Sequence, residues 1–234
     1  MTRPTLVALA LFAATGCARH APIVVVHPSP PVGCALPSEL DVDCRCTTPD
    51  CLWKLGIVYG EGIDVPRDEA RARGLYARSC AGDNVRACTN LASLLVEGRG
   101  GPRDERRAGD LYERACRRHD PVACFNLGVL FAGGRGRALD GATAALLFQE
   151  SCSRGVAHAC ADLGLQYARG EGAPVDLQLA VEMFRRACRG GDRDGCEDLA
   201  ALRPSMQDGD LEQLIRKLRR SCDDGDARAC RQLR

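Results

Sequence analysis

Two cysteines separated by seven residues recur along this chain and constrain its fold more than any other feature. The pairs are Cys80/Cys88, Cys116/Cys124, Cys152/Cys160, Cys188/Cys196 and Cys222/Cys230. Successive pairs are 36 residues apart, except for a last step of 34 residues. A fixed period of this size indicates stacked supersecondary units, each too small to bury its apolar face alone.

Other positions keep the same period and define two helices in each unit. A leucine column holds Leu55, Leu91, Leu127, Leu163 and Leu199. A glycine column that ends the first helix holds Gly62, Gly98, Gly134 and Gly170. An aspartate column that begins the second helix holds Asp68, Asp104, Asp140, Asp176 and Asp210. Nothing alternates as a strand does, so we predict an all-α solenoid with units near 48–83, 84–119, 120–155, 156–191 and 192–225, plus a C-terminal partial helix.

The first helices begin at their own column of N-cap residues. This column holds Thr48, Asn84, Asp120, Asp192 and Asp226, with Val156 as the exception. The first cysteine of each pair therefore falls in the last turn of one unit, and the second falls in the first turn of the next. Antiparallel helices joined by so tight a turn bring the two Cβ atoms within bonding range. We predict that all five pairs are disulfides, because separate pairs would give a metal only two ligands each.

Four cysteines near the N-terminus are less regular: Cys34, Cys44, Cys46 and Cys51. They allow three connectivities. We favour Cys44–Cys51 with Cys34–Cys46, because Cys44 stands 36 residues before Cys80 in the first cysteine column. A four-cysteine zinc site remains the alternative for this group.

The N-terminus has the pattern of an export signal. A basic start precedes the apolar run 5–15, which is too short to span a bilayer. The run ends in Ala14-Thr15-Gly16-Cys17, which resembles a bacterial lipobox, with an ordinary signal peptide and a chance cysteine as the alternative. We predict a signal peptide over 1–16, lipidated Cys17 with a Pro-rich tether over 17–33, and the solenoid over 34–234. The expected location is the cell envelope, in the periplasm or anchored to the outer membrane.

The unit resembles a known repeat. Leu163-Gly164-x-x-Tyr167-x-x-Gly170-x-Gly172, followed by an aspartate and an Ala-x-x-x-Phe helix, resembles the Sel-one-like repeat, a relative of the tetratricopeptide repeat. The paired cysteines are similar to those of its cysteine-rich Hcp branch. The resemblance covers about residue 44 to the end. It implies a right-handed α/α superhelical solenoid of disulfide-stapled units, with a concave groove that binds proteins or peptides. Hcp members are also often called β-lactamases.

The chain lacks the motifs of an ordinary β-lactamase. S-x-x-K is absent, because Cys51 and Leu214 stand three residues before the only two lysines. His119 and His158 stand alone rather than in a zinc-ligand cluster. We therefore name no catalytic residue and expect no metal and no cofactor. β-Lactam hydrolysis or penicillin binding stays open as the alternative function, by resemblance only.

The candidate binding residues lie on first helices, at positions predicted to point away from the core. They are Trp53, Thr89, Phe125, Glu97, Arg169, Asn90 and Asn126. The large apolar side chains could anchor a partner, or each could cover a neighbouring helix. The asparagines could instead bond backbone between helices.

The sequence thus predicts a lipid-anchored monomer that scaffolds another protein or binds a peptide, with cell-wall peptides as one candidate. A purely structural envelope protein is a third possibility. The formal charge of +1 gives no field that would attract nucleic acid.

Overall fold

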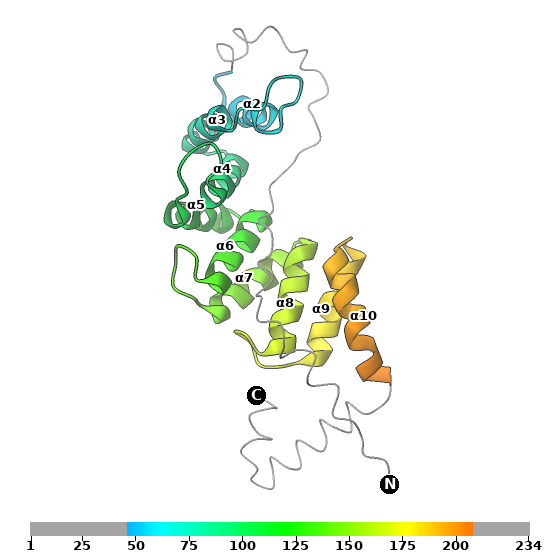
Figure 1. Cartoon of the computed structure of the whole chain (residues 1–234). Helices are drawn as coiled ribbons and strands as arrows, with labels where there is room; N and C mark the ends of the chain where they lie inside the picture. The colour runs from blue at the N-terminus through cyan, green and yellow to red at the C-terminus, as the bar shows by residue number, and fades with distance from the viewer. Residues whose placement is uncertain (1–45, 208–234) are drawn as a thin grey trace, which may run out of the picture.

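The computed structural model describes residues 46–207, and within that range the regular structure is entirely α-helical. The helices are α2 (Pro49–Glu61), α3 (Glu69–Ala81), α4 (Val85–Glu97), α5 (Glu105–Arg117), α6 (Pro121–Gly133), α7 (Gly141–Ser153), α8 (Ala157–Arg169), α9 (Leu177–Arg189) and α10 (Arg193–Gln207). Consecutive helices form hairpins that follow one another from α2 at one end to α10 at the other (Figure 1). The prediction of an all-α solenoid is confirmed.

The predicted caps begin and end these helices. The side chains of Thr48, Asp68 and Asn84 accept bonds from backbone N–H groups in the first turns of α2, α3 and α4. Val156 precedes α8 without a side-chain cap, as its residue type requires. The first helices end at glycines in the left-handed region: Gly62, Gly98, Gly134 and Gly170, with φ of 72°, 71°, 61° and 73°. This conformation is easy for glycine because it has no Cβ.

Small residues let the two helices of a hairpin approach closely. A Cβ added at Gly128 would lie 2.7 Å from the Phe148 ring, and one added at Gly164 would lie 2.7 Å from the Phe184 ring. Phe148 and Phe184 are 2% and 1% exposed, so the rings fill the space that the glycines leave. Within the described residues, the buried apolar side chains form three successive clusters along the stack of hairpins.

Disulfides join each hairpin to the next where the structure describes both cysteines. The bridges are Cys80–Cys88, Cys116–Cys124, Cys152–Cys160 and Cys188–Cys196, with Cα–Cα distances between 4.5 and 4.7 Å. Each cysteine pair spans the tight turn between a second helix and the following first helix. The fifth predicted pair, Cys222–Cys230, lies outside the described residues, as do residues 1–45 with Cys17.

The predicted pairing at the N-terminal end is wrong. Cys51 is bonded to Cys46, with a Cα–Cα distance of 5.4 Å, so neither Cys44–Cys51 nor Cys34–Cys46 forms. Cys51 stands one residue before the second cysteine column, where α2 carries Leu52 instead. In the first turn of α2 it meets the segment just before the N-cap. This bridge also takes two of the four thiolates that the alternative zinc site needs.

Within 46–207, every helix is too short or too polar to cross a bilayer.

Candidate functional site

Three of the predicted binding residues, Trp53, Thr89 and Phe125, form a column at equivalent positions of successive units, and all three are buried. Trp53 is 2% exposed, and Thr89 and Phe125 are fully buried. The Arg86 guanidinium lies 5.2 Å from the Trp53 ring centroid, and the His158 ring lies 6.3 Å from that of Phe125. Arg86 and His158 lie in the first turns of α4 and α8, the first helices of the following units. The prediction that this column points away from the core is therefore wrong, because it lies where consecutive first helices meet.

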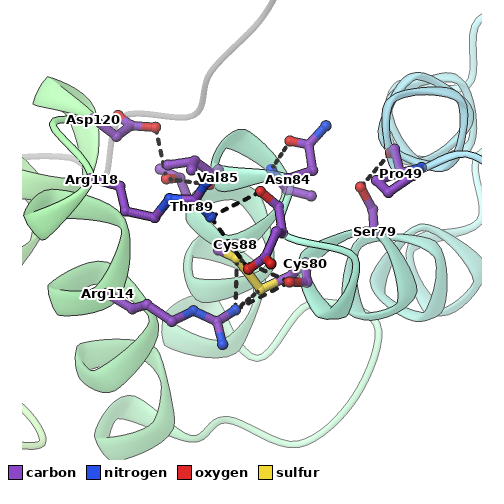
Figure 2. The surroundings of a disulfide bond; sticks show 12 residues. Pro49, Ser79, Cys80, Asn84, Val85, Cys88, Thr89, Arg114, Arg118 and Asp120 are labelled. Atoms are coloured by element: carbon purple, nitrogen blue, oxygen red, sulfur yellow. Dashed lines mark hydrogen bonds and ion pairs between the residues drawn. A yellow bond between two sulfur atoms is a disulfide. The ribbon is translucent and has the colours of Figure 1, made fainter.

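Thr89 shows the same contact through polar atoms. Its hydroxyl lies 3.0 Å from Oδ2 of Asp120, the N-cap of the next first helix, and 3.2 Å from the Val85 carbonyl oxygen. Figure 2 shows Thr89 between Val85 and Asp120. A residue that bonds the next unit in this way positions helices and offers no free group to a ligand.

The two asparagines also face protein. Asn90 and Asn126 are 1% and 0% exposed, and they are hydrogen-bonded to the hydroxyls of Tyr76 and Tyr112 from the preceding second helices. Burial raises the pKa of both tyrosines, so these hydroxyls stay protonated. The asparagine ladder thus joins consecutive units through satisfied buried bonds.

Glu97 and Arg169 remain accessible but do not meet. Glu97 accepts a bond from Arg99 at 3.1 Å, and Arg169 lies 3.9 Å from Glu171. They end α4 and α8, which belong to units two apart. Each therefore pairs locally, just past the end of its own helix.

None of the predicted binding residues lines a hollow that the described residues form on the later hairpins. This hollow has a volume of about 240 Å³ and lies between α7 and α9, with α8 at its base. Its apolar lining is Leu163, Tyr167, Leu179, Met183 and Cys152, and its polar lining is Gln149, Ser153, Glu182 and Arg186. Leu179 is 38% exposed at its edge.

A sequence signal for this region exists but is weak. Leu179 stands in a column that holds Arg71, Arg107 and Thr143 in the other units. Leu146 on α7, which is 68% exposed, stands where the neighbouring units have Asp110 and Glu182. Apolar residues at positions that are polar elsewhere mark these two helices as different.

An acidic group lies where α8 meets α10. Burial, together with the negative charges of Asp192, Asp194 and Asp198, raises the pKa of Asp162 to about 7, against the lowering effect of Arg169. Asp192 is 3% exposed, and its Oδ2 contacts Nδ1 of His158. This junction therefore changes charge near neutral pH, which makes it an electrostatic feature of the scaffold.

No described arrangement supports catalysis by a metal or a histidine. Among residues 46–207, the one group of three or more potential ligand residues with atoms within 4.8 Å of one another is Cys116, Cys124 and Glu150, and its two sulfurs are bonded to each other. His119 lies beside Arg154 at 3.2 Å, and His158 lies beside Asp192. The β-lactamase alternative gains no structural support.

Comparison with known proteins identifies the repeat. The family model described as Sel1 repeat matches residues 49–84, 85–120, 121–156 and 157–192, more than half of the chain. A comparison with curated proteins gives no match.

Solved structures show the same fold. A Sel1 repeat protein from Oxalobacter formigenes is 22% identical, with a TM-score of 0.63, over 66% of this chain and 61% of that one. The protective antigen c5321 of uropathogenic Escherichia coli, described as displaying an SLR fold, is 22% identical, with a TM-score of 0.55, over 80% and 48%. Helicobacter pylori cysteine rich protein B is 24% identical, with a TM-score of 0.46, over 57% and 96%. This chain thus spans about three fifths and about half of the first two structures.

The bridge at each described junction agrees with the cysteine-rich branch that the sequence resembles. Four matched units and the helical stack lead to one conclusion: the chain belongs to the Sel1 repeat family.

Proposed function

We propose that this protein is an extracytoplasmic, disulfide-rich lipoprotein that serves as a scaffold for a protein or peptide partner in the cell envelope. The observation that carries the binding role is the hollow between α7 and α9, open at Leu179 and lined at its base by Leu163 and Tyr167. Large apolar residues beside a few polar groups form the kind of site that receives an anchor residue of a partner.

The size of the hollow favours a side chain over a small molecule. Small-molecule sites commonly measure about 300–1,000 Å³, whereas this hollow measures about 240 Å³. Met183 and Leu179 would contact an apolar anchor such as leucine, methionine or phenylalanine. Glu182 and Arg186 at the same site offer an acceptor and donors to the partner's backbone or charged side chains.

The thiol chemistry supports the proposed location. Bridges that recur at every described junction persist in oxidising compartments and are rare in the cytosol. The export signal over 1–16 and the lipobox-like Cys17 support the same address. A chain held at a membrane by its N-terminus would present the solenoid to partners in the envelope.

Site-specific photocrosslinking tests the binding role. A photoreactive amino acid replaces Leu179 in one variant and Leu139 in another, because Leu139 is 73% exposed and does not line the hollow. Irradiated intact envelopes should give one defined adduct from position 179 and none of the same mass from position 139. Leu179→Arg, introduced with the probe at Glu182, should remove the adduct while the circular dichroism stays unchanged.

Other results would reject the proposed binding surface or the proposed membrane anchoring. Equal adducts at 179 and 139, or no adduct from any position around the hollow, would reject this surface as a binding site. Labelled lipid found on a residue other than Cys17, or protein found only in the cytosolic fraction, would reject the proposed anchoring.

A further inference from the structure

Each of two disulfides has a charged side chain from the following unit beside it. This side chain is positive at one disulfide and negative at the other. Arg114 on α5 places Nη2 2.6 Å from the Cys80 sulfur and 2.9 Å from the Cys88 sulfur. It also donates to the Cys80 carbonyl oxygen at 3.3 Å. Figure 2 shows the guanidinium of Arg114 directed at this bridge.

The next bridge along the solenoid has a carboxylate in that place. Glu150 stands 36 residues after Arg114, and one of its oxygens lies within 4.8 Å of the sulfurs of both Cys116 and Cys124. Arg154 lies 3.5 Å from Glu150 and offsets part of its charge. The two bridges thus share their helical frame and differ in the charge beside the sulfurs.

This difference matters only when a bridge opens. A disulfide is neutral, whereas the sulfur that leaves during thiol–disulfide exchange carries a negative charge. A nearby arginine stabilises a thiolate, and a nearby carboxylate destabilises one. Whichever sulfur leaves, Cys80 or Cys88, it lies within 3 Å of the Arg114 guanidinium.

We propose that Cys80–Cys88 is a thiol–disulfide exchange site, which dithiols open at equilibrium before Cys116–Cys124. One thiolate of the dithiol attacks a bridge sulfur, the S–S bond breaks, and its electron pair goes to the leaving cysteine beside Arg114. The second thiol of the dithiol, after losing its proton, displaces the other cysteine and closes a disulfide within the reagent. The bridge gains two electrons and two protons, and the dithiol loses both.

Exposure alone predicts no such order. Cys80 and Cys88 are each 3% exposed, whereas Cys116 is 8% and Cys124 is 0% exposed. The ring size is also the same, because each pair is separated by eight positions. An early opening of Cys80–Cys88 would therefore reflect the neighbouring charge.

The test is an equilibrium titration of the full oxidised chain with mixtures of reduced and oxidised dithiothreitol at pH 8. After an acid quench, free thiols are alkylated and tryptic peptides are quantified. Trypsin places Cys80, Cys88 and Cys124 on separate peptides, because arginines flank each of them. Cys80 and Cys88 should be half reduced at a reagent ratio about tenfold less reducing than Cys124, the effect expected for about one unit of thiolate pKa.

Charge variants separate this effect from a merely structural one. Arg114→Gln should make Cys80–Cys88 harder to reduce, and Arg114→Lys should keep the original order. Glu150→Gln should make Cys116–Cys124 easier to reduce. Arg117→Gln is the matched control on α5, because Arg117 is 69% exposed and pairs with Glu113.

Three results would overturn the proposal. The two bridges could open together in the unmodified protein, or Arg117→Gln could shift them as much as Arg114→Gln does. Most informative would be easier reduction in Arg114→Gln, because a variant that only loosens the folded unit weakens the preference for the oxidised state. Circular dichroism at each reagent ratio verifies that the helices persist.

Discussion

Replacing Asp162 by asparagine should stabilise the protein at alkaline pH and leave it unchanged at acidic pH. The reason lies in the asparagine ladder between units, because Asp162 stands in the same column as Asn90 and Asn126. Asn90 and Asn126 are hydrogen-bonded to Tyr76 and Tyr112, but the equivalent positions of the following units hold aspartates and phenylalanines. Asp162 therefore brings a carboxyl group to a position where the earlier units have a neutral amide.

The magnitude follows from its pKa. Burial and the charges of Asp192, Asp194 and Asp198 raise the pKa of Asp162 from 3.8 to about 7. Three pH units correspond to about 4 kcal/mol, and the partial solvent contact of this residue reduces the expected effect to about 2 kcal/mol. The pKa of Asp162 is higher in the folded state than in the unfolded state. The contribution of Asp162 to the free energy of unfolding is therefore fully present below pH 4 and is lost as the pH rises through 7.

Urea unfolding followed by circular dichroism, from pH 4 to 8.5 at constant ionic strength, measures the difference. The free energy of unfolding of Asp162→Asn should exceed that of the unmodified protein by about 2 kcal/mol at pH 8.5 and equal it at pH 4. Asp83→Asn is the control, because the side chain of this aspartate is 82% exposed. Asparagine also tolerates the positive φ of this position, which is 67°. A difference that is independent of pH, or a less stable Asp162→Asn at pH 8.5, would refute the reasoning.

Three further predictions concern stability, each measured by urea unfolding of the oxidised protein. Gly100→Ala should lower the free energy of unfolding by about 3 kcal/mol, because the φ of Gly100 is 67° and the added Cβ would lie 2.2 Å from the Glu69 carbonyl oxygen. Gly155→Ala, with open space around the added Cβ, should lower it by about 1 kcal/mol. Equal losses in the two variants would contradict this reasoning. Ser151→Ala should cost about 1 kcal/mol, because its hydroxyl donates to the Pro121 carbonyl oxygen at 2.7 Å, and no loss would show that this bond contributes nothing. Removing the Cys116–Cys124 bridge by a double alanine substitution should cost about 2.5 kcal/mol, as the loop-entropy model gives for a ring of about nine residues, and an unchanged midpoint would count against that model here.

The sequence was sufficient for the fold because each unit repeats its own local signals. Asp68 and Asp104 begin helices, Gly98 ends one, and the cysteines lie on either side of a turn of fixed length. These features depend on residues close in sequence, so a single unit predicts them and the period multiplies them. Even the missing cap at Val156 was visible as a departure from its column.

The candidate site was harder to predict because it depends on how units pack on one another. Periodicity shows which side of α4 faces α5, but the burial of Thr89 follows from the approach of α6. The same applies to Trp53, which Arg86 of the next unit covers. The hollow beside Leu179 arises where side chains of two second helices leave space, and no single unit encodes that space.

The bridge between Cys46 and Cys51 shows a second limit of periodicity. Cys44 occupies the first cysteine column, yet Cys51 stands one residue off the second. A shift of one residue on a helix turns the side chain by about 100°. The cysteine that bonds Cys51 is therefore set by the local chain before α2 rather than by the period.

The central claim is that disulfides join consecutive helical hairpins, and mass spectrometry of the intact exported protein tests it most directly. The protein is unfolded and alkylated once without and once with prior reduction, and linked peptides are mapped. The ten cysteines of the five described bridges should take up label only after reduction, with Cys116 linked to Cys124 and Cys152 to Cys160. If most of these cysteines take up label without reductant, the hairpins are not joined by sulfur, and both the proposed location and the proposed exchange site are wrong.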